Sequence, residues 1–186
     1  MVEYYCFVSR NKDNTDVANF KKRNKYYIID GGGYDAVADM LKAFSQFVSA
    51  GQKGEMCRLY KQYNTINKDK VLKSVVCRIL SDNISLSNIN KVIASEMNKS
   101  KNHSTRKWLF DIDTKDINKC EEFLHDLKAC FGDNVVENIV PTPNGFALIV
   151  NHGFDTRKLN EKWSGVVECK RDNALLFIGS MHNNVK

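Results

Sequence analysis

Two aspartates one residue apart end an apolar stretch at residues 107–113, Lys-Trp-Leu-Phe-Asp-Ile-Asp. On a β-strand the side chains alternate between two faces, so Asp111 and Asp113 should point to the same side. Carboxylates this close repel each other, and a hard divalent cation between them relieves the repulsion. Oxygen ligands of this kind suit Mg²⁺ or Mn²⁺ bound together with substrate phosphates. The stretch therefore predicts a Mg²⁺ or Mn²⁺ site; the structural alternative is a helix cap on a solvated strand edge.

A third carboxylate lies in a second apolar stretch, residues 165–170, in which Glu168 and Lys170 share a face. If this strand neighbours residues 107–113, then Asp111, Asp113 and Glu168 converge. Three converging carboxylates indicate a metal site, because three buried negative charges are otherwise prohibitively costly. The predicted metal ligands are therefore these three residues.

Several side chains and one turn could bind a phosphate or a base. A strand at residues 55–63 would place a cation beside an aromatic ring, an arrangement that suits a phosphate and a stacked base, although a surface salt bridge is the alternative. A tight Asn-Gly turn lets backbone approach a phosphate, although it also makes a plain hairpin. The predicted nucleotide- or nucleic-acid-binding residues are Arg58, Tyr60, Asn144, Gly145, Arg157, Lys158 and Lys170.

The bulk composition limits the possible classes of protein. A chain of 186 residues, 42% hydrophobic, can build one substantial core or one domain with an N-terminal appendage. The net charge of +6 indicates, weakly, a polyanionic partner. Two basic groups, which solvated loops would also explain, are Lys21, Lys22, Arg23 and Lys25, and then Lys99, Lys101, Arg106 and Lys107.

Location and redox state are also predicted from the sequence. No apolar run has the length that spans a bilayer, and the first residues do not resemble a secretory signal, so we expect no membrane partner and a cytoplasmic location. The six cysteines are scattered, without the spacing of a zinc site, and are expected to be reduced thiols.

The candidate residues require particular elements to position them. In the first half we expect strands at residues 2–9, 25–30 and 55–63, and helices at 34–50, about 67–81 and about 86–97. The Asn/Lys/Ser-rich stretch 98–105 is the best linker candidate. The chain therefore divides into an N-terminal α/β unit, residues 1–100, and a second part, residues 101–186, within what could be one compact domain.

The second part is more regular. Strands are predicted at residues 107–113, about 135–140 and about 146–151, with helices at 116–131 and 156–163. A hairpin follows, made of residues 165–170 and 174–179 and a turn at 171–173. The order β-α-β-β-α-β-β predicts an α+β fold with an antiparallel-rich sheet, helices on one face and the other face left for a ligand.

Two other motifs have partly similar patterns. Residues 111–122 have the acidic ends of an EF-hand loop, but the required glycine is replaced by Asp116 and Lys115 also departs from the pattern, so an EF-hand calcium loop is excluded. An Asp-x-Asp after an apolar strand is also typical of haloacid-dehalogenase phosphatases. Those enzymes begin with that strand and carry a later Asp-Asp pair, so this is the minor alternative.

The run of motifs over residues 105–180 resembles the archaeo-eukaryotic primase and primase-polymerase superfamily, especially its small viral members. The motifs are the apolar strand ending in Asp-x-Asp, a helix, Pro-x-Pro-Asn-Gly-Phe opening a strand, and an acidic residue in an apolar strand. The resemblance implies an RRM-like catalytic core with a flanking α/β unit. It also implies that Asp111, Asp113 and Glu168, with Asp172 as second choice for the third position, are catalytic metal ligands.

One position departs from that family. A histidine that contacts the nucleotide phosphates is expected shortly after the glycine turn, and Ala147 stands there. Two hypotheses follow. The chain is a divergent primase-like nucleotidyltransferase that acts on nucleoside triphosphates and a nucleic-acid template in the host cytoplasm, if it is viral. Alternatively it is a catalytically inactive accessory or inhibitory protein that binds nucleotide or nucleic acid on the same fold.

Overall fold

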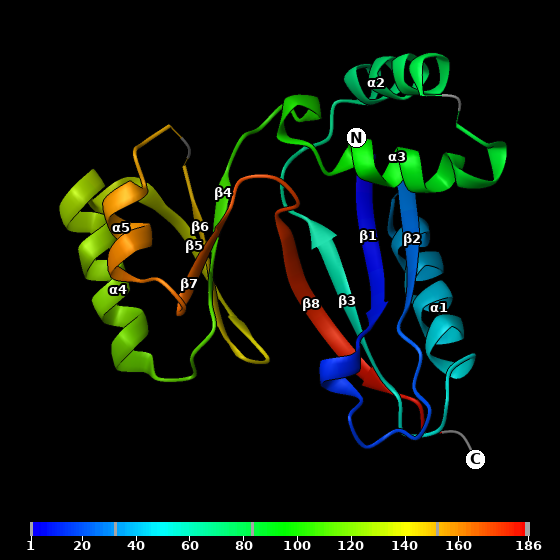
Figure 1. Ribbon diagram of the computed structural model, residues 1–186, viewed down its shortest axis with the longest axis horizontal. Helices are drawn as coiled ribbons and strands as arrows, with labels where there is room; N and C mark the ends of the chain where they lie inside the picture. Colours follow the sequence, from blue (N-terminus) through cyan, green and yellow to red (C-terminus); the bar gives the residue numbers. More distant parts are fainter. Residues whose placement is uncertain (1, 32, 83, 152, 185–186) are drawn as a thin grey trace. The chain divides into compact units, whose positions relative to one another are not determined.

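The computed structural model describes residues 2–31, 33–82, 84–151 and 153–184. It is an α+β structure with two antiparallel four-stranded sheets and flanking helices, as the sequence predicts (Figure 1). The chain divides into two compact units, one made of Met1–His103 with Leu175–Lys186 and the other of Ser104–Ala174. In the part of the chain that the structure describes, no helix is both long enough and apolar enough to cross a membrane.

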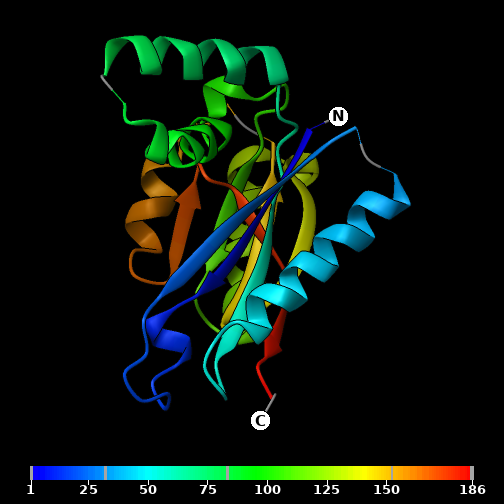
Figure 2. The same cartoon turned by 90° about the vertical axis from the view of Figure 1, so that its right-hand side faces the viewer.

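The sheet of the first unit has the strand order β2-β1-β3-β8, with every pair antiparallel. Its strands are β1 (Val2–Ser9), β2 (Arg23–Asp30), β3 (Met56–Gln62) and β8 (Leu175–His182). Its helices are α1 (Tyr34–Ser49), α2 (Lys68–Ser81) and α3 (Ile89–Met97). The helix α1 runs along the sheet, whereas α2 and α3 lie where β1 begins (Figure 2). Short 3-10 turns are Asn11–Asp13, Leu86–Asn88 and Ser100–Asn102.

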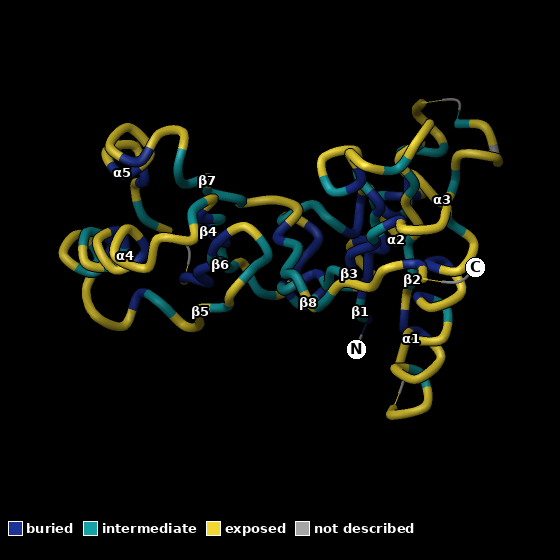
Figure 3. Tube along the Cα trace, turned by 90° about the horizontal axis from the view of Figure 1, so that it is seen from below, coloured by how far each residue is buried: buried dark blue, intermediate teal, exposed yellow. Residues whose placement is uncertain are grey.

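Strand β1 carries the core of this unit on both of its faces. Tyr5 and Phe7 pack with Phe44 and Phe47 of α1, while Tyr4 and Cys6 pack with residues of α2 and α3. This is why β1 reads as a continuous apolar run instead of an alternating one. Figure 3 shows the buried segments following the strands of the sheets, with exposed residues along the outer sides of the helices.

The second unit has the strand order β5-β6-β4-β7, also antiparallel throughout. Its strands are β4 (Trp108–Ile112), β5 (Val136–Thr142), β6 (Gly145–Val150) and β7 (Val167–Lys170). Its helices are α4 (Ile117–Phe131) and α5 (Arg157–Lys162), with a 3-10 turn at Asp133–Val135. The sequence β-α-β-β-α-β, with the first strand between the third and fourth, is the RRM-like arrangement that was predicted.

One face of this second sheet packs against its helices. Phe110 and Ile112 of β4 and Leu148 of β6 contact Phe123 and Leu127 of α4 in a single apolar cluster. Because side chains alternate along a strand, the residues between them face away from the helices. That second face carries Asp111, Ala147 and Glu168, which are in register.

The predicted hairpin of residues 165–170 and 174–179 is wrong. Strand β7 pairs with β4 in the second sheet, whereas β8 pairs with β3 in the first. The apolar pattern of residues 174–179 correctly indicates a strand, but hydrophobic pattern does not specify a strand's partner. The segment after Ala174 therefore returns to the first unit, although the sequence division had placed it in the second part.

Candidate functional site

Two of the carboxylates singled out by the sequence lie opposite each other on the face of the second sheet that points away from α4 and α5. Asp111 of β4 lies directly opposite Glu168 of β7 on one side and Ala147 of β6 on the other. Directly opposed residues of an antiparallel pair have Cβ atoms about 5 Å apart. The prediction that the two strands are neighbours is thus confirmed.

Asp113 follows the last residue of β4 and continues its pairing with β7. Its backbone N–H donates to the carbonyl oxygen of Val166 at 2.9 Å, and its side chain is exposed. By strand alternation it shares the face of Asp111. Within residues 2–31, 33–82, 84–151 and 153–184, no group of three or more His, Cys, Asp or Glu side chains is arranged to hold a metal ion. The predicted convergence of three carboxylates is therefore incomplete. Asp111 and Glu168 lie opposite each other, whereas Asp113 lies beyond the last residue of β4.

A lysine lies between the two opposed carboxylates. The Lys170 ammonium forms an ion pair with Asp111 Oδ2 and lies 3.7 Å from Glu168 Oε2. The side chains of Lys170 and Asp111 are 29% and 27% exposed, whereas that of Glu168 is 74% exposed. In this structure the repulsion between the carboxylates is therefore relieved by a cation from the same strand as Glu168.

The structural alternative makes the Asp-x-Asp pair the cap of the helix that follows β4. In the structure a different residue caps this helix. Asp116 is the N-cap of α4, and its Oδ1 accepts a hydrogen bond from the N–H of Asn118 at 3.0 Å. This contact satisfies one of the amides left unpaired at the start of a helix. Capping therefore does not explain Asp111 and Asp113, so that part of the alternative is wrong, although Asp113 is exposed at the end of its strand as the alternative expects.

Gly145 opens β6 where the chain passes the end of β4. A Cβ at this position would overlap the carbonyl oxygen of Ile112 and the backbone of Thr114. The space left by the missing side chain is thus occupied by the protein's own backbone, next to Asp113. Asn144 is exposed in the two-residue turn between β5 and β6, as predicted for a hairpin.

Arg157 and Lys158 do not lie beside the carboxylates, which corrects the expectation from the sequence. They begin α5, and Leu159 of this helix belongs to the apolar cluster on the helix-covered face of the sheet. Asp111 is on the opposite face, so the sheet separates the two sets. Arg157 forms a surface ion pair with Asp155 at 2.5 Å, which holds the pKa of that carboxyl at about 2. These cations are close to Glu168 and Lys170 in the sequence, but the sequence does not show which face of the sheet α5 covers.

Arg58 and Tyr60 belong to the first unit and share a face of β3, as predicted. The guanidinium of Arg58 is not available at the surface, because its side chain is only 5% exposed and its Nη2 donates to Asp13 Oδ1 at 2.5 Å. Tyr60 is partly buried and meets Phe177 edge to face, with ring centroids 5.9 Å apart. Arg58 thus forms an ion pair, as the alternative expected, but the pair is buried and not at the surface.

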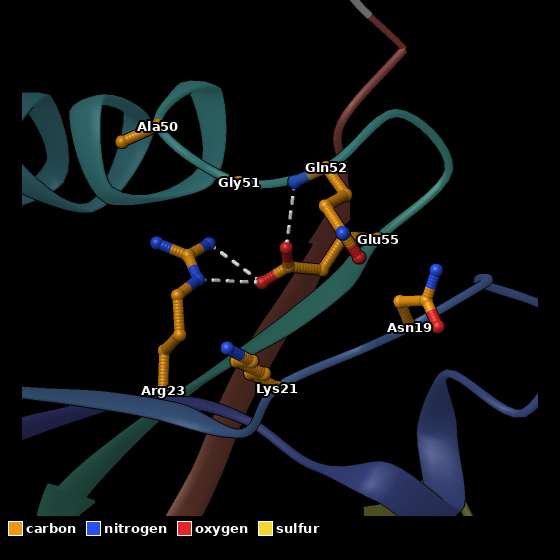
Figure 4. A pocket seen from close by; sticks show the side chains of 7 residues that line it. All are labelled: Asn19, Lys21, Arg23, Ala50, Gly51, Gln52 and Glu55. Carbon is orange, nitrogen blue, oxygen red and sulfur yellow. Dashed lines mark hydrogen bonds and ion pairs between the residues drawn. The ribbon is translucent and has the colours of Figure 1, made fainter.

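A second ion pair of the first unit, with a cavity beside it, was not predicted from the sequence. Arg23 Nη2 lies 2.6 Å from Glu55 Oε1, and the N–H of Gln52 donates to Glu55 Oε2 at 2.8 Å (Figure 4). Burial raises the pKa of Glu55, but these hydrogen bonds outweigh it and bring the pKa below its usual value. The cavity, of about 450 Å³, is lined by Asn19, Lys21, Arg23, Ala50, Gly51, Gln52 and Glu55. The basic group 21–25 was its only signal in the sequence.

Comparisons with protein-family models, with curated proteins and with solved structures find no match to this chain. Support for a function therefore comes from its own residues and their geometry. The features that bear on chemistry are the register pair of Asp111 and Glu168, the lysine between them, and the sheet face, pointing away from α4 and α5, that carries all three.

Proposed function

We propose that this chain is a divergent primase-like nucleotidyltransferase, which joins nucleoside triphosphates on a nucleic-acid template with the help of Mg²⁺ or Mn²⁺. The observation that carries the proposal is the position of Asp111 opposite Glu168 on the face of an RRM-like sheet that points away from α4 and α5. Two acidic side chains directly opposite each other on neighbouring strands repel, so this position favours a cation, which Lys170 supplies in the structure. The primase resemblance of residues 105–180 supplies the reaction.

The carboxylates fit a divalent ion in one particular mode. Magnesium is usually held by one or two carboxylates together with substrate phosphates, without a complete cage of protein ligands. Asp111 and Glu168, with Asp113 at the end of the strand, offer such oxygen donors on a partly exposed face. When bound, the ion would stabilise the charge that develops on the phosphates during transfer of the nucleotidyl group.

The side chain of Lys170 has a defined part in this proposal. In the structure it neutralises Asp111 and keeps the opposed carboxylates compatible. Its flexible stem lets the ammonium turn from Asp111 to an incoming triphosphate, because a lysine is a mobile point charge with three donors. Lys170 would then hold the phosphate charge that the family's histidine holds, while Asp111 is released to bind metal.

The second candidate is a protein that binds nucleotide or nucleic acid without turnover. Ala147 favours it, because the residue directly opposite Asp111 is small and buried and carries no imidazole. The ion pair of Lys170 with Asp111 also favours it, since a sheet neutralised by its own lysine needs no metal. Both candidate proteins bind nucleotide or nucleic acid. They differ in whether the chain joins the bound nucleotides.

Incorporation of labelled nucleotide on primed and unprimed templates, with Mg²⁺ or Mn²⁺, tests the proposal. We expect metal-dependent incorporation by the wild type and its loss, by at least about 100-fold, in Asp113→Asn, in line with the large share of electrostatic terms in such transfers. Glu121→Gln is the matched control, because Glu121 is an exposed carboxylate on α4, away from the carboxylate face.

Two results would contradict the proposal. Binding of nucleotide or template without incorporation, across templates and with both metals, would establish the binding protein instead. Incorporation that persists in both Asp111→Asn and Asp113→Asn would remove the carboxylates from the chemistry. Calorimetry with Mn²⁺ and a nucleoside triphosphate measures the metal separately from turnover.

A further inference from the structure

A basic segment of the first unit, residues 19–25, lies between two cavities. The first, of about 450 Å³, contains Lys21 and Arg23 on its wall (Figure 4). The second, of about 460 Å³, is lined by Val8, Ser9, Arg10, Asn11, Lys22, Arg23 and Asn24. Lys21 lines the first cavity and Lys22 lines the second. The segment thus offers cations to both of its sides.

Arg23 fixes this segment in place. Its guanidinium binds Glu55 through both Nε and Nη2, donates to the carbonyl oxygen of Phe47 and lies 4.4 Å from the centre of the Phe47 ring. Glu55 is 2% exposed, so this pair is anchored on a buried carboxylate. The lysines next to Arg23 are therefore held at defined positions although they are exposed.

The charge around the segment is not balanced by carboxylates. Among the described residues, no ion pair involves Lys21, Lys22 or Lys25. The second cavity has no acidic residue in its lining, and the first has only Glu55, which Arg23 neutralises. Behind the second cavity, one carboxylate, Asp13, is shared by two guanidinium groups, Arg10 and Arg58. That group of three carries a net positive charge.

We propose that residues 19–25 bind the phosphodiester backbone of single-stranded nucleic acid. Strand β2 is at the edge of its sheet, so a ligand lying along its outer side can reach side chains that point to either face. Lys21 and Lys25 flank the anchored Arg23 and are about 13 Å apart on an extended chain, a distance comparable to two steps between phosphates in an extended strand. Charge of this kind binds without reading sequence.

This site is separate from the carboxylates and requires no metal. The inference rests on the proposed function only for the class of ligand, because either proposed activity needs a nucleic-acid strand. Phosphate contacts of this type position a strand and take no part in the chemistry. Binding measured with the metal removed therefore tests the segment alone.

Fluorescence anisotropy with a labelled oligothymidylate, in EDTA and over a range of salt concentrations, is the experiment. For the double variant Lys21→Gln/Lys22→Gln we expect at least about fivefold weaker binding at moderate salt. The slope of log K against log salt should fall by about 1.4, since each phosphate neutralised on a single strand contributes about 0.7. The matched control is Lys42→Gln/Lys73→Gln, two exposed lysines of α1 and α2 on the same unit, which should change the affinity less than twofold.

The outcomes separate this site from general charge and from the proposed catalysis. Equal losses in the two double variants would reduce the effect to net charge and overturn the proposal, as would no binding in EDTA. Preferential binding to phosphatidylserine vesicles or to a duplex would also overturn it. Loss of binding in Lys21→Gln/Lys22→Gln without any incorporation by the wild type would support the segment and reject the enzyme. Nucleotide incorporation that is lost in Asp113→Asn, together with unchanged strand binding in Lys21→Gln/Lys22→Gln, would support the enzyme and reject the binding segment.

Discussion

Arg58 stabilises the first unit from inside, because its guanidinium and the carboxylate of Asp13 are each 5% exposed. Replacing it with alanine leaves that carboxylate buried with Arg10 as its remaining partner. Removing one partner of a buried pair costs about 3–5 kcal/mol, and we expect the lower end because Arg10 stays. Urea denaturation of Arg58→Ala should therefore show a free energy of unfolding reduced by about 3 kcal/mol.

Lys61→Ala provides the comparison for Arg58. Lys61 forms an ion pair with Glu3 at 2.5 Å, but the two side chains are 35% and 26% exposed. Such partly exposed pairs contribute at most about 1 kcal/mol. Equal losses in the two variants would contradict the buried-pair explanation. A stable Arg58→Ala with weaker nucleotide binding would restore the ligand-binding role that the sequence suggested.

The carboxyl of Glu55 makes stability depend on pH. Burial raises its pKa, but hydrogen bonds from Arg23 and from the Gln52 N–H lower it further, so the folded pKa lies below the usual 4.5. A depressed carboxyl pKa gives stability that is present above the unfolded value and is lost as pH falls through the folded value. We expect the free energy of unfolding to fall below about pH 4.5, and the fall to be smaller in Glu55→Gln. Urea titrations at pH 7 and pH 3 measure this; an unchanged acid dependence would contradict it.

The contact between β4 and β6 depends on one glycine. An alanine at Gly145 would place its Cβ on backbone atoms of Ile112 and Thr114, which cannot rotate away as a side chain could. Overpacking typically costs about 1–3 kcal/mol, and we expect the upper end for Gly145→Ala. Hydrogen exchange should show lower protection in β4 and β6, and metal or nucleotide binding at the neighbouring Asp113 should weaken as well.

Gly179→Ala is the matched control for Gly145. Gly179 lies in β8 with no atom within 4 Å of an added Cβ and without a positive φ. Alanine there removes the conformational freedom of a glycine in a strand interior and should leave stability unchanged or slightly higher. Similar protection in both variants would show that the backbone at Gly145 has more room than the structure indicates.

At the level of elements, periodicity was enough to predict most of the structure. The helical spacing that ends at Phe131 and the strand ending in Asp113 predicted α4 and β4 within one or two residues. The alternation of side chains along a strand also predicted that Arg58 and Tyr60 share a face. This alternation does not show what covers the face, so it could not predict that Arg58 is buried. The cavity at Arg23 was likewise missed, because it needs Gln52 and Glu55, which are distant in the sequence.

At the scale of the whole chain, the second unit is an insertion. Residues 104–174 lie in the sequence between β3 and β8, which pair with each other in the first sheet. The sequence predicted the boundary near residue 100 from its linker composition and an antiparallel-rich sheet from the order of elements, while the RRM-like core was implied by the primase resemblance. The return of the chain to the first sheet could not be predicted, because β8 pairs with β3 across about 120 residues of sequence, and a local pattern contains no such information.

The insertion predicts unequal effects of a C-terminal truncation. A chain that ends at Ala174 keeps every strand of the second sheet but removes β8, the partner of β3 from Met56 to Gln62. Strand β3 then becomes an edge, with a row of unpaired backbone groups. Hydrogen exchange of this truncated chain should show lost protection in β3, while β4 and β6 keep theirs. Equal loss in both sheets would show instead that the two units fold as one cooperative body, and unchanged protection in β3 would show that β8 adds little to the first sheet.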